Sequence, residues 1–174
     1  SEFYFWSLLM GQSNAYEIPF NIYGDSLRVK VLVPGAASGV LVGGNLSLIC
    51  SVMGSKYEVR TANSILFIED VGESPYRVDR YLQELKLAGK FDHINGLIIG
   101  RFSRRKTEEP DKPTDFKMEE VFRQYFAKLK VPVIYDFPSG HGSKNISIPF
   151  GAKVDINTEN QLFKLLEQPV SIDN

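Results

Sequence analysis

The sequence has few of the residues on which disulfide and metal chemistry depend. Its 174 residues include one cysteine, Cys50, and two histidines. A single cysteine excludes an intramolecular disulfide framework and gives no spacing of the zinc-binding kind, so we expect no metal and no cofactor. Cys50 lies in the apolar run LSLICSVM, which predicts a small buried side chain and a poor thiolate rather than a nucleophile.

Long apolar runs and strong net charge are also lacking. No apolar run reaches the roughly 18 residues needed for a membrane span. The hydrophobic share is 43%, the charged share is 24% and the formal net charge is -1, which is typical of an ordinary globular protein. The one basic cluster, residues 101–106, runs directly into acidic residues and is interpreted as a solvated loop. We therefore expect neither a nucleic acid nor a membrane as partner.

The start of the chain lacks an initiator methionine and a basic segment, so no signal peptide is predicted. Residues 3–10 are apolar on almost all sides, which predicts a short helix that packs the only tryptophan, Trp6. Residues 11–19 (GQSNAYEIP) are typical of a linker. The apolar start predicts that this helix packs against material outside the given sequence, and the length of the chain fits one domain.

Strands and helices are expected to alternate along the rest of the chain. Asn45 and Ser74 are predicted helix N-caps, and Gly54 and Gly89 are placed to end the same two helices. Apolar alternation and short apolar runs predict strands at 27–34, 39–42, 65–68, 94–102, 131–135, 146–151, 152–157 and 161–167, and helices at 45–53, 75–88 and 116–129. Because the helices connect strands, we predict a single α/β domain with a mixed, β-rich sheet.

Three acids follow the predicted strand at 65–68, namely Glu69, Asp70 and Glu73. A carboxylate at the end of a buried strand can hold a catalytic group in place. An acid in this position can equally cap the next helix. The residues alone leave both interpretations open.

His141 lies between Gly140 and Gly142, just after an apolar run. The glycines would leave its ring accessible, as a general base requires, but a surface histidine in a glycine-rich turn is equally ordinary. A nucleophile is not evident, since neither Ser139 nor Ser143 sits in a G-x-S-x-G turn.

A glycine pair, Gly43 and Gly44, precedes the helix that Asn45 is expected to cap. Backbone N–H groups at such a step can bind an anion or a carboxylate, which makes Gly43, Gly44 and Asn45 candidate substrate-binding residues. Close packing of strand against helix is the alternative explanation.

Five segments, taken in order, resemble one known family. They are GVLVGGNLSLI, ILFIEDVGESPYRVDRYLQELKLAG, INGLIIGRF, VPVIYDFPSGHG and ISIPFGAKV. Together they are similar to the C-terminal domain of the LD-carboxypeptidases, a serine peptidase family that includes the muramoyl-tetrapeptide carboxypeptidases and the microcin C immunity peptidases. The likeness runs from about Val40 to the end of the chain.

The resemblance implies a swivelling β/β/α fold with helices on one side of layered sheets, and an active site divided between two domains. The family's glutamate falls on Glu69 and its histidine on His141, whereas the serine belongs to an N-terminal domain. Residues 1–24 are then expected to be a remnant helix and linker from that missing domain, and residues 25–174 the C-terminal domain. The implied parent protein is a cytoplasmic carboxypeptidase, with a homodimer among its expected assemblies, that cleaves the L,D bond before a terminal D-alanine in murein peptides. The chain alone is then expected to be inactive. A microcin C-type peptidase and a non-catalytic binding or dimerisation module are the alternatives.

Overall fold

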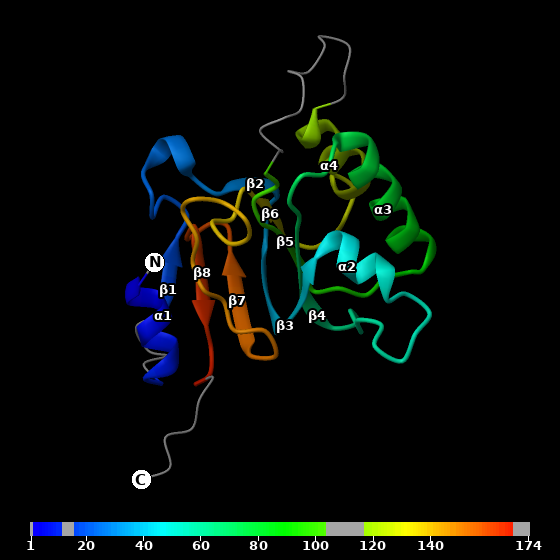
Figure 1. Ribbon diagram of the computed structural model, residues 1–174. Coiled ribbons are helices and arrows are strands. Elements are labelled where there is room, and N and C mark those ends of the chain that lie inside the picture. Colours follow the sequence, from blue (N-terminus) through cyan, green and yellow to red (C-terminus); the bar gives the residue numbers. More distant parts are fainter. Residues whose placement is uncertain (1, 12–15, 104–116, 169–174) are drawn as a thin grey trace.

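The computed structural model describes residues 2–11, 16–103 and 117–168 (Figure 1). Across these ranges, eight strands form one sheet in the order β1-β8-β7-β3-β4-β5-β6-β2. The strands are β1 (Glu17–Pro19), β2 (Lys30–Val33), β3 (Ala36–Asn45), β4 (Ser64–Glu69), β5 (Gly96–Ile99), β6 (Val133–Tyr135), β7 (Lys153–Asn157) and β8 (Leu162–Leu165). The helices are α1 (Glu2–Leu9), α2 (Leu46–Ser51), α3 (Pro75–Leu87) and α4 (Met118–Phe126), with a 3-10 turn η2 at Asp25–Leu27.

The sheet is mixed, as predicted. Strands β3, β4, β5 and β6 run parallel, and the strands on either side of them pair antiparallel. Every residue of β4, β5 and β6 is buried, which explains why these strands are continuous apolar runs in the sequence. Because parallel neighbours present their carboxyl ends at one edge, the residues that follow β4, β5 and β6 meet there.

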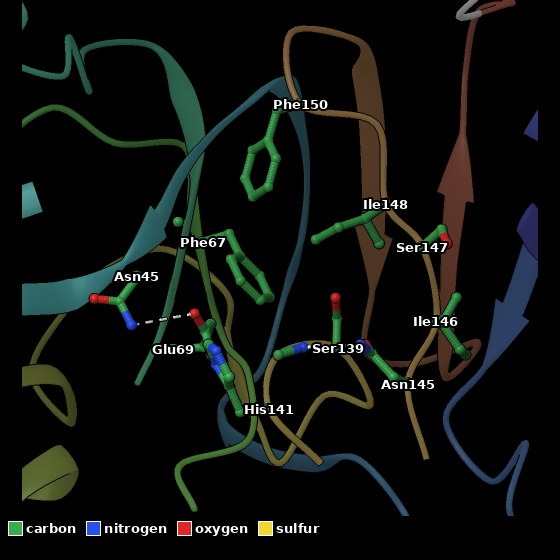
Figure 2. Close-up of a pocket in the computed structure, with 12 residues that line it drawn as sticks. Asn45, Phe67, Glu69, Ser139, His141, Asn145, Ile146, Ser147, Ile148 and Phe150 are labelled. Atoms are coloured by element: carbon green, nitrogen blue, oxygen red, sulfur yellow. Dashed lines mark hydrogen bonds and ion pairs between the residues drawn. The ribbon is translucent and has the colours of Figure 1, made fainter. Parts of the chain in front are cut away.

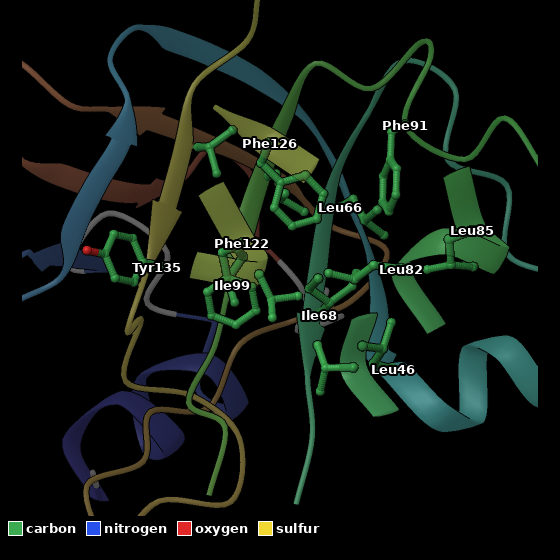
Figure 3. Close-up of a cluster of buried hydrophobic side chains, with 14 of the residues drawn as sticks. Leu46, Leu66, Ile68, Leu82, Leu85, Phe91, Ile99, Phe122, Phe126 and Tyr135 are labelled. Carbon is green, nitrogen blue, oxygen red and sulfur yellow. The ribbon is translucent and has the colours of Figure 1, made fainter. Parts of the chain in front are cut away.

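Two apolar clusters cover the two faces of the sheet. One cluster lies under α2, α3 and α4 and includes Leu46, Leu82 and Phe122 (Figure 3). The other contains Tyr16, Leu41 and residues of β1, β7 and β8, and the N-terminal helix α1 packs against it. The helices that follow β3 therefore share one face, and α1 lies on the other.

Most predicted elements are present, and their ends follow local signals. Asn45 caps α2 through its side chain, Pro75 begins α3 after Ser74, and Gly89 adopts φ +69° just past the end of α3. The NTEN turn joins β7 to β8 as an antiparallel hairpin. The strand predicted at 39–42 is longer, since β3 pairs with β7 at its start and with β4 at its end.

Two expectations were wrong near the sheet edges, and a third holds only in part. The strand predicted at 27–34 begins only at Lys30, and Val31 is 39% exposed because β2 is an edge strand that pairs with β6 alone. Residues 17–19 are not linker but strand β1, which pairs with β8 and buries Ile18. The packing expected of Trp6 is only partial, since 56% of the residue is exposed and its ring contacts that of Phe5 edge-to-face.

The strand predicted at 146–151 was also wrong. This segment has an alternating apolar pattern, but it makes no ladder with a neighbouring strand. Pro149 cannot donate a backbone hydrogen bond, which disfavours ladder formation there. Part of the predicted basic loop, residues 104–106, lies outside the described residues. No described helix is both long and apolar enough to span a membrane.

Candidate active site

Glu69 and His141 form a hydrogen-bonded pair at the carboxyl edge of the parallel strands (Figure 2). The distance between His141 Nδ1 and Glu69 Oε2 is 2.7 Å. The Glu69 side chain is 8% exposed, whereas the imidazole is 49% exposed. The pair therefore combines a buried carboxylate that can orient the ring with a ring whose other nitrogen can face a reactant.

Backbone pairing brings these two residues together although 72 positions separate them. Glu69 is the last residue of β4, and Gly140 forms a parallel bridge with Arg101 just beyond β5. The amide of Gly140 also donates to Asn145 Oδ1 at 3.2 Å, which holds the loop closed.

Glycine is required where this loop passes Glu69. A Cβ atom at Gly100 would lie 2.5 Å from the carbonyl oxygen of Ser139 and 3.0 Å from Cβ of Glu69. A Cβ atom at Gly140, where φ is +120°, would lie 2.8 Å from Glu69 Oε2. These two glycines allow the histidine loop to approach the carboxylate closely.

The two competing acids have other contacts. Asp70 is 2% exposed, and its Oδ2 accepts a hydrogen bond from the backbone N–H of Ser47 at 2.9 Å. It therefore caps the helix before it, α2, and not the helix after it. Glu73 pairs with Arg77 at 3.5 Å. Among the described residues, only Glu69 forms an ion pair or hydrogen bond with His141.

The three candidate substrate-binding residues, Gly43, Gly44 and Asn45, have different surroundings. A Cβ atom at Gly43 would lie 1.9 Å from the carbonyl oxygen of Phe67, so this glycine serves the close pairing of β3 with β4. At Gly44, where φ is +144°, a Cβ atom would have nothing within 4 Å. Gly44 and Asn45 both line the pocket beside the Glu69–His141 pair.

This pocket has a volume of about 350 Å³. Sequence reasoning missed its apolar wall, which is formed by Phe67, Ile146, Ile148 and Phe150. Figure 2 shows Phe150 above Phe67, with ring centroids 5.7 Å apart in an edge-to-face contact. The alternation in 146–151, which we interpreted as a strand, was the sequence signal for this wall. In an extended segment, alternation directs Ile146, Ile148 and Phe150 to one side whether or not a neighbouring strand pairs with them.

The described residues contain no other obvious catalytic group. No cluster of three or more His, Cys, Asp or Glu side chains in this part of the chain could hold a metal ion. Cys50 is buried and its thiol lies 3.6 Å from the carbonyl oxygen of Tyr81. Burial raises the pKa of Cys50 to about 12, so it is a thiol and not a thiolate near neutral pH.

Comparison with known proteins gives a consistent result. Residues 38–156 match the LD-carboxypeptidase C-terminal domain family. The chain is 40% identical over 142 residues to the probable murein peptide carboxypeptidase of Bacillus subtilis, a match that covers 82% of this chain and 44% of that protein. It is 35% identical over 114 residues to the murein tetrapeptide carboxypeptidase of Pseudomonas aeruginosa, covering 65% of this chain and 36% of that protein.

Solved structures agree in fold. The microcin C7 self-immunity protein MccF superposes with a TM-score of 0.71 at 27% identity, over 82% of this chain and 42% of that one. The muramoyltetrapeptide carboxypeptidase from Oxalobacter formigenes superposes with a TM-score of 0.67 at 23% identity, over 92% of this chain and 53% of that one, which shows the fold alone. The chain spans less than half the length of the two curated carboxypeptidases named above. It belongs to the LD-carboxypeptidase C-terminal domain family.

Proposed function

We propose that this chain is the C-terminal half of a serine carboxypeptidase that cleaves the L,D bond before a terminal D-alanine in murein tetrapeptides. In this proposal Glu69 and His141 complete a catalytic triad whose serine lies outside the 174 residues. The observation that carries it is the 2.7 Å contact between His141 Nδ1 and Glu69 Oε2. Relatives with murein peptide names, at 40% and 35% identity, support the substrate class.

Each residue would have a separate task. Glu69 accepts from Nδ1–H of His141 and leaves Nε2 free to take the proton of the serine hydroxyl. The serine oxygen attacks the carbonyl carbon, the C–N bond breaks, and Nε2 returns the proton to the departing amine of D-alanine. Water then hydrolyses the acyl-enzyme with the same imidazole as base. The half-exposed ring beside a buried carboxylate suits these steps.

The pocket supports a small, uncharged group next to the scissile bond. Apart from the Glu69–His141 pair, its lining residues are neutral, and Phe67, Ile148 and Phe150 give it an apolar wall. We propose that Gly44 contacts substrate and that Asn45, predicted with it, lines the same pocket and acts through Glu69. Gly43, predicted with them, would act indirectly by allowing β3 to lie against β4.

The experiment compares the chain alone with a complete active site. The purified 174-residue chain should release no D-alanine from murein tetrapeptide. A chimera in which residues 38–156 replace the matching segment of the Bacillus subtilis relative should release it. D-alanine release by the chain alone would exclude a serine outside the chain, and a folded but inactive chimera would contradict the catalytic assignment.

Variants of the chimera test the two residues. His141→Ala and Glu69→Gln should each lower kcat roughly a thousandfold or more, because residues of such a triad act as a unit. His93→Ala is the matched control, since the other histidine is exposed and outside the pocket. It should leave kcat unchanged. Full activity of the His141→Ala chimera would remove His141 from the mechanism.

A second candidate function rests on the likeness to MccF, at a TM-score of 0.71. One solved MccF structure holds aspartyl sulfamoyl adenosine, so a peptidyl or aminoacyl nucleotide is an alternative substrate. The lower sequence identity, 27% against 40%, makes us rank it second. Assaying the chimera on both substrates separates the two, and activity on neither would favour a binding or dimerisation module.

A further inference from the structure

Asp70 is a buried carboxylate that the proposed mechanism does not use. Its residue is 2% exposed, and a carboxylate in such a place is unfavourable unless it is hydrogen-bonded. Three donors meet it. Oδ2 accepts from the N–H of Ser47 at 2.9 Å, and Oδ1 accepts from the N–H of Val71 and from Nδ2 of Asn45, both at 2.8 Å. These three hydrogen bonds hold the Asp70 side chain in one orientation.

The Asn45 side chain is held at both ends. Its Oδ1 accepts from the N–H of Leu48 at 3.1 Å and from the hydroxyl of Ser47 at 2.8 Å. Only the amide nitrogen can then face Asp70, because two donors already occupy the oxygen side. The orientation of the amide therefore follows from its contacts.

The same amide nitrogen faces Glu69. Nδ2 of Asn45 lies 3.5 Å from Oε1 of Glu69, while Oε2 of Glu69 lies 2.7 Å from Nδ1 of His141. Strand pairing reinforces this arrangement, since Asn45 and Glu69 are Cα partners in the parallel register of β3 and β4. The two oxygens of Glu69 thus have different partners.

We propose that Asn45 and Asp70 are positioning residues for the Glu69–His141 pair. Asp70 holds the Asn45 amide, and the amide directs Oε1 of Glu69 away from the imidazole so that Oε2 alone meets Nδ1. Because a carboxylate only accepts, a Glu69 side chain held in this place keeps the proton of His141 on Nδ1 and leaves Nε2 free. This inference rests on the proposed function, because a base at Nε2 matters only for that chemistry.

The test reads the tautomer of His141 directly in the 174-residue chain. The sequence has only two histidines, so labelling them with nitrogen-15 gives two ring signals. In the wild type, His141 should show the Nδ1–H tautomer with slowed exchange of that proton. His93 is exposed and serves as the internal control.

Two variants change the positioning contact and leave Glu69 and His141 themselves unaltered. Asn45→Ser keeps an oxygen that can cap α2 but loses the amide donor, so stability should change little. Asp70→Asn keeps the shape but removes the charge that attracts the Asn45 amide, and its single oxygen cannot accept from all three donors. Each should make the Nδ1 proton of His141 exchange roughly tenfold faster, the factor that corresponds to one hydrogen bond of ordinary strength. Both should lower the share of the Nδ1–H tautomer, with His93 unchanged.

Glu73→Gln is the control for charge, since Glu73 is a neighbouring acid that contacts Arg77 and not Asn45. It should leave the His141 signals as in the wild type. If Asn45→Ser and Asp70→Asn also leave them unchanged, the positioning inference is wrong while the Glu69–His141 pair stands. If the wild type itself shows no preference for Nδ1–H, the pair on which the proposed function rests is wrong as well.

Discussion

Gly140 and Glu69 approach each other so closely that a Cβ atom at position 140 would have to displace the Glu69 side chain. A Cβ atom there would lie 2.8 Å from Oε2 of Glu69, the oxygen that also contacts His141. The backbone at Gly140 adopts φ +120°, which side chains other than glycine disfavour. One glycine therefore decides both the path of the histidine loop and access to the carboxylate.

Replacing Gly140 by alanine should separate the pair. We expect Gly140→Ala to lower the free energy of unfolding by about 1–3 kcal/mol from backbone strain, and to displace His141 from Glu69. Urea unfolding and the ring signals of His141 measure the two effects. Gly24→Ala is the matched control, with φ +83° and nothing within 4 Å of the added Cβ. Equal effects of both variants on the His141 signals would contradict the steric explanation.

Gly43 and Gly44, which are neighbours in β3, should differ sharply in how well they tolerate replacement by alanine. Gly43→Ala would place Cβ 1.9 Å from the carbonyl oxygen of Phe67, so the pairing of β3 with β4 cannot persist and the chain should fail to fold. Gly44→Ala meets nothing within 4 Å and should cost only about 1–2 kcal/mol for its positive φ. Circular dichroism and thermal unfolding distinguish the two. A native-like Tm for Gly43→Ala would refute the close approach.

Cys50 should be unreactive while the chain is folded. Burial raises its pKa to about 12, so at pH 8 about one thiol in ten thousand is ionised, against about one in four for an ordinary thiol. Labelling with a disulfide reagent should then be about a thousandfold slower in the folded chain than in urea. Between pH 9 and 11 the rate should keep rising for the folded chain and level off for the unfolded one. Equal rates at pH 8 would contradict burial of the thiol.

Tyr125 should stabilise the contact between α3 and α4. Its hydroxyl donates to Asp79, whose carbonyl oxygen and Oδ1 both lie at 2.9 Å, and burial together with this bond raises its pKa to about 12. Tyr125→Phe should lower the free energy of unfolding by about 1 kcal/mol. Tyr57→Phe, at a residue 72% exposed, should change it little. Urea unfolding of the two variants gives the comparison, and indistinguishable midpoints would count against the bond.

Elements with strong local signals were predictable. The start of α3 at Ser74 and Pro75, and the cap of α2 at Asn45, need only the nearest residues, because capping geometry is local. The conformation of residues 146–151 could not be predicted from local signals in the same way. Its apolar alternation allows a strand or a pocket wall, and the choice depends on whether a neighbouring strand is free to pair.

The identity of the acid that contacts His141 shows the same limit more clearly. Glu69, Asp70 and Glu73 are close in sequence, and their spacing does not distinguish a partner for histidine from a helix cap. The resemblance to the family selected Glu69, and the structure places that side chain alone of the three against His141. Asp70 is directed instead to α2, because it is the next residue beyond the strand and side chains there point to the opposite face.

The sequence by itself determined the α/β class, the cap of α2, the start of α3, the buried central strands and the inert character of Cys50, because each depends on neighbouring residues or on composition. Only the tertiary structure decided that Glu69 meets His141 across 72 positions, that the Asn45 amide faces both Asp70 and Glu69, and that a Cβ atom at Gly43 or Gly140 would meet atoms of Phe67 or Glu69. These relationships depend on strand register and on the close approach of distant backbones, and short-range patterns in the chain do not encode such distances.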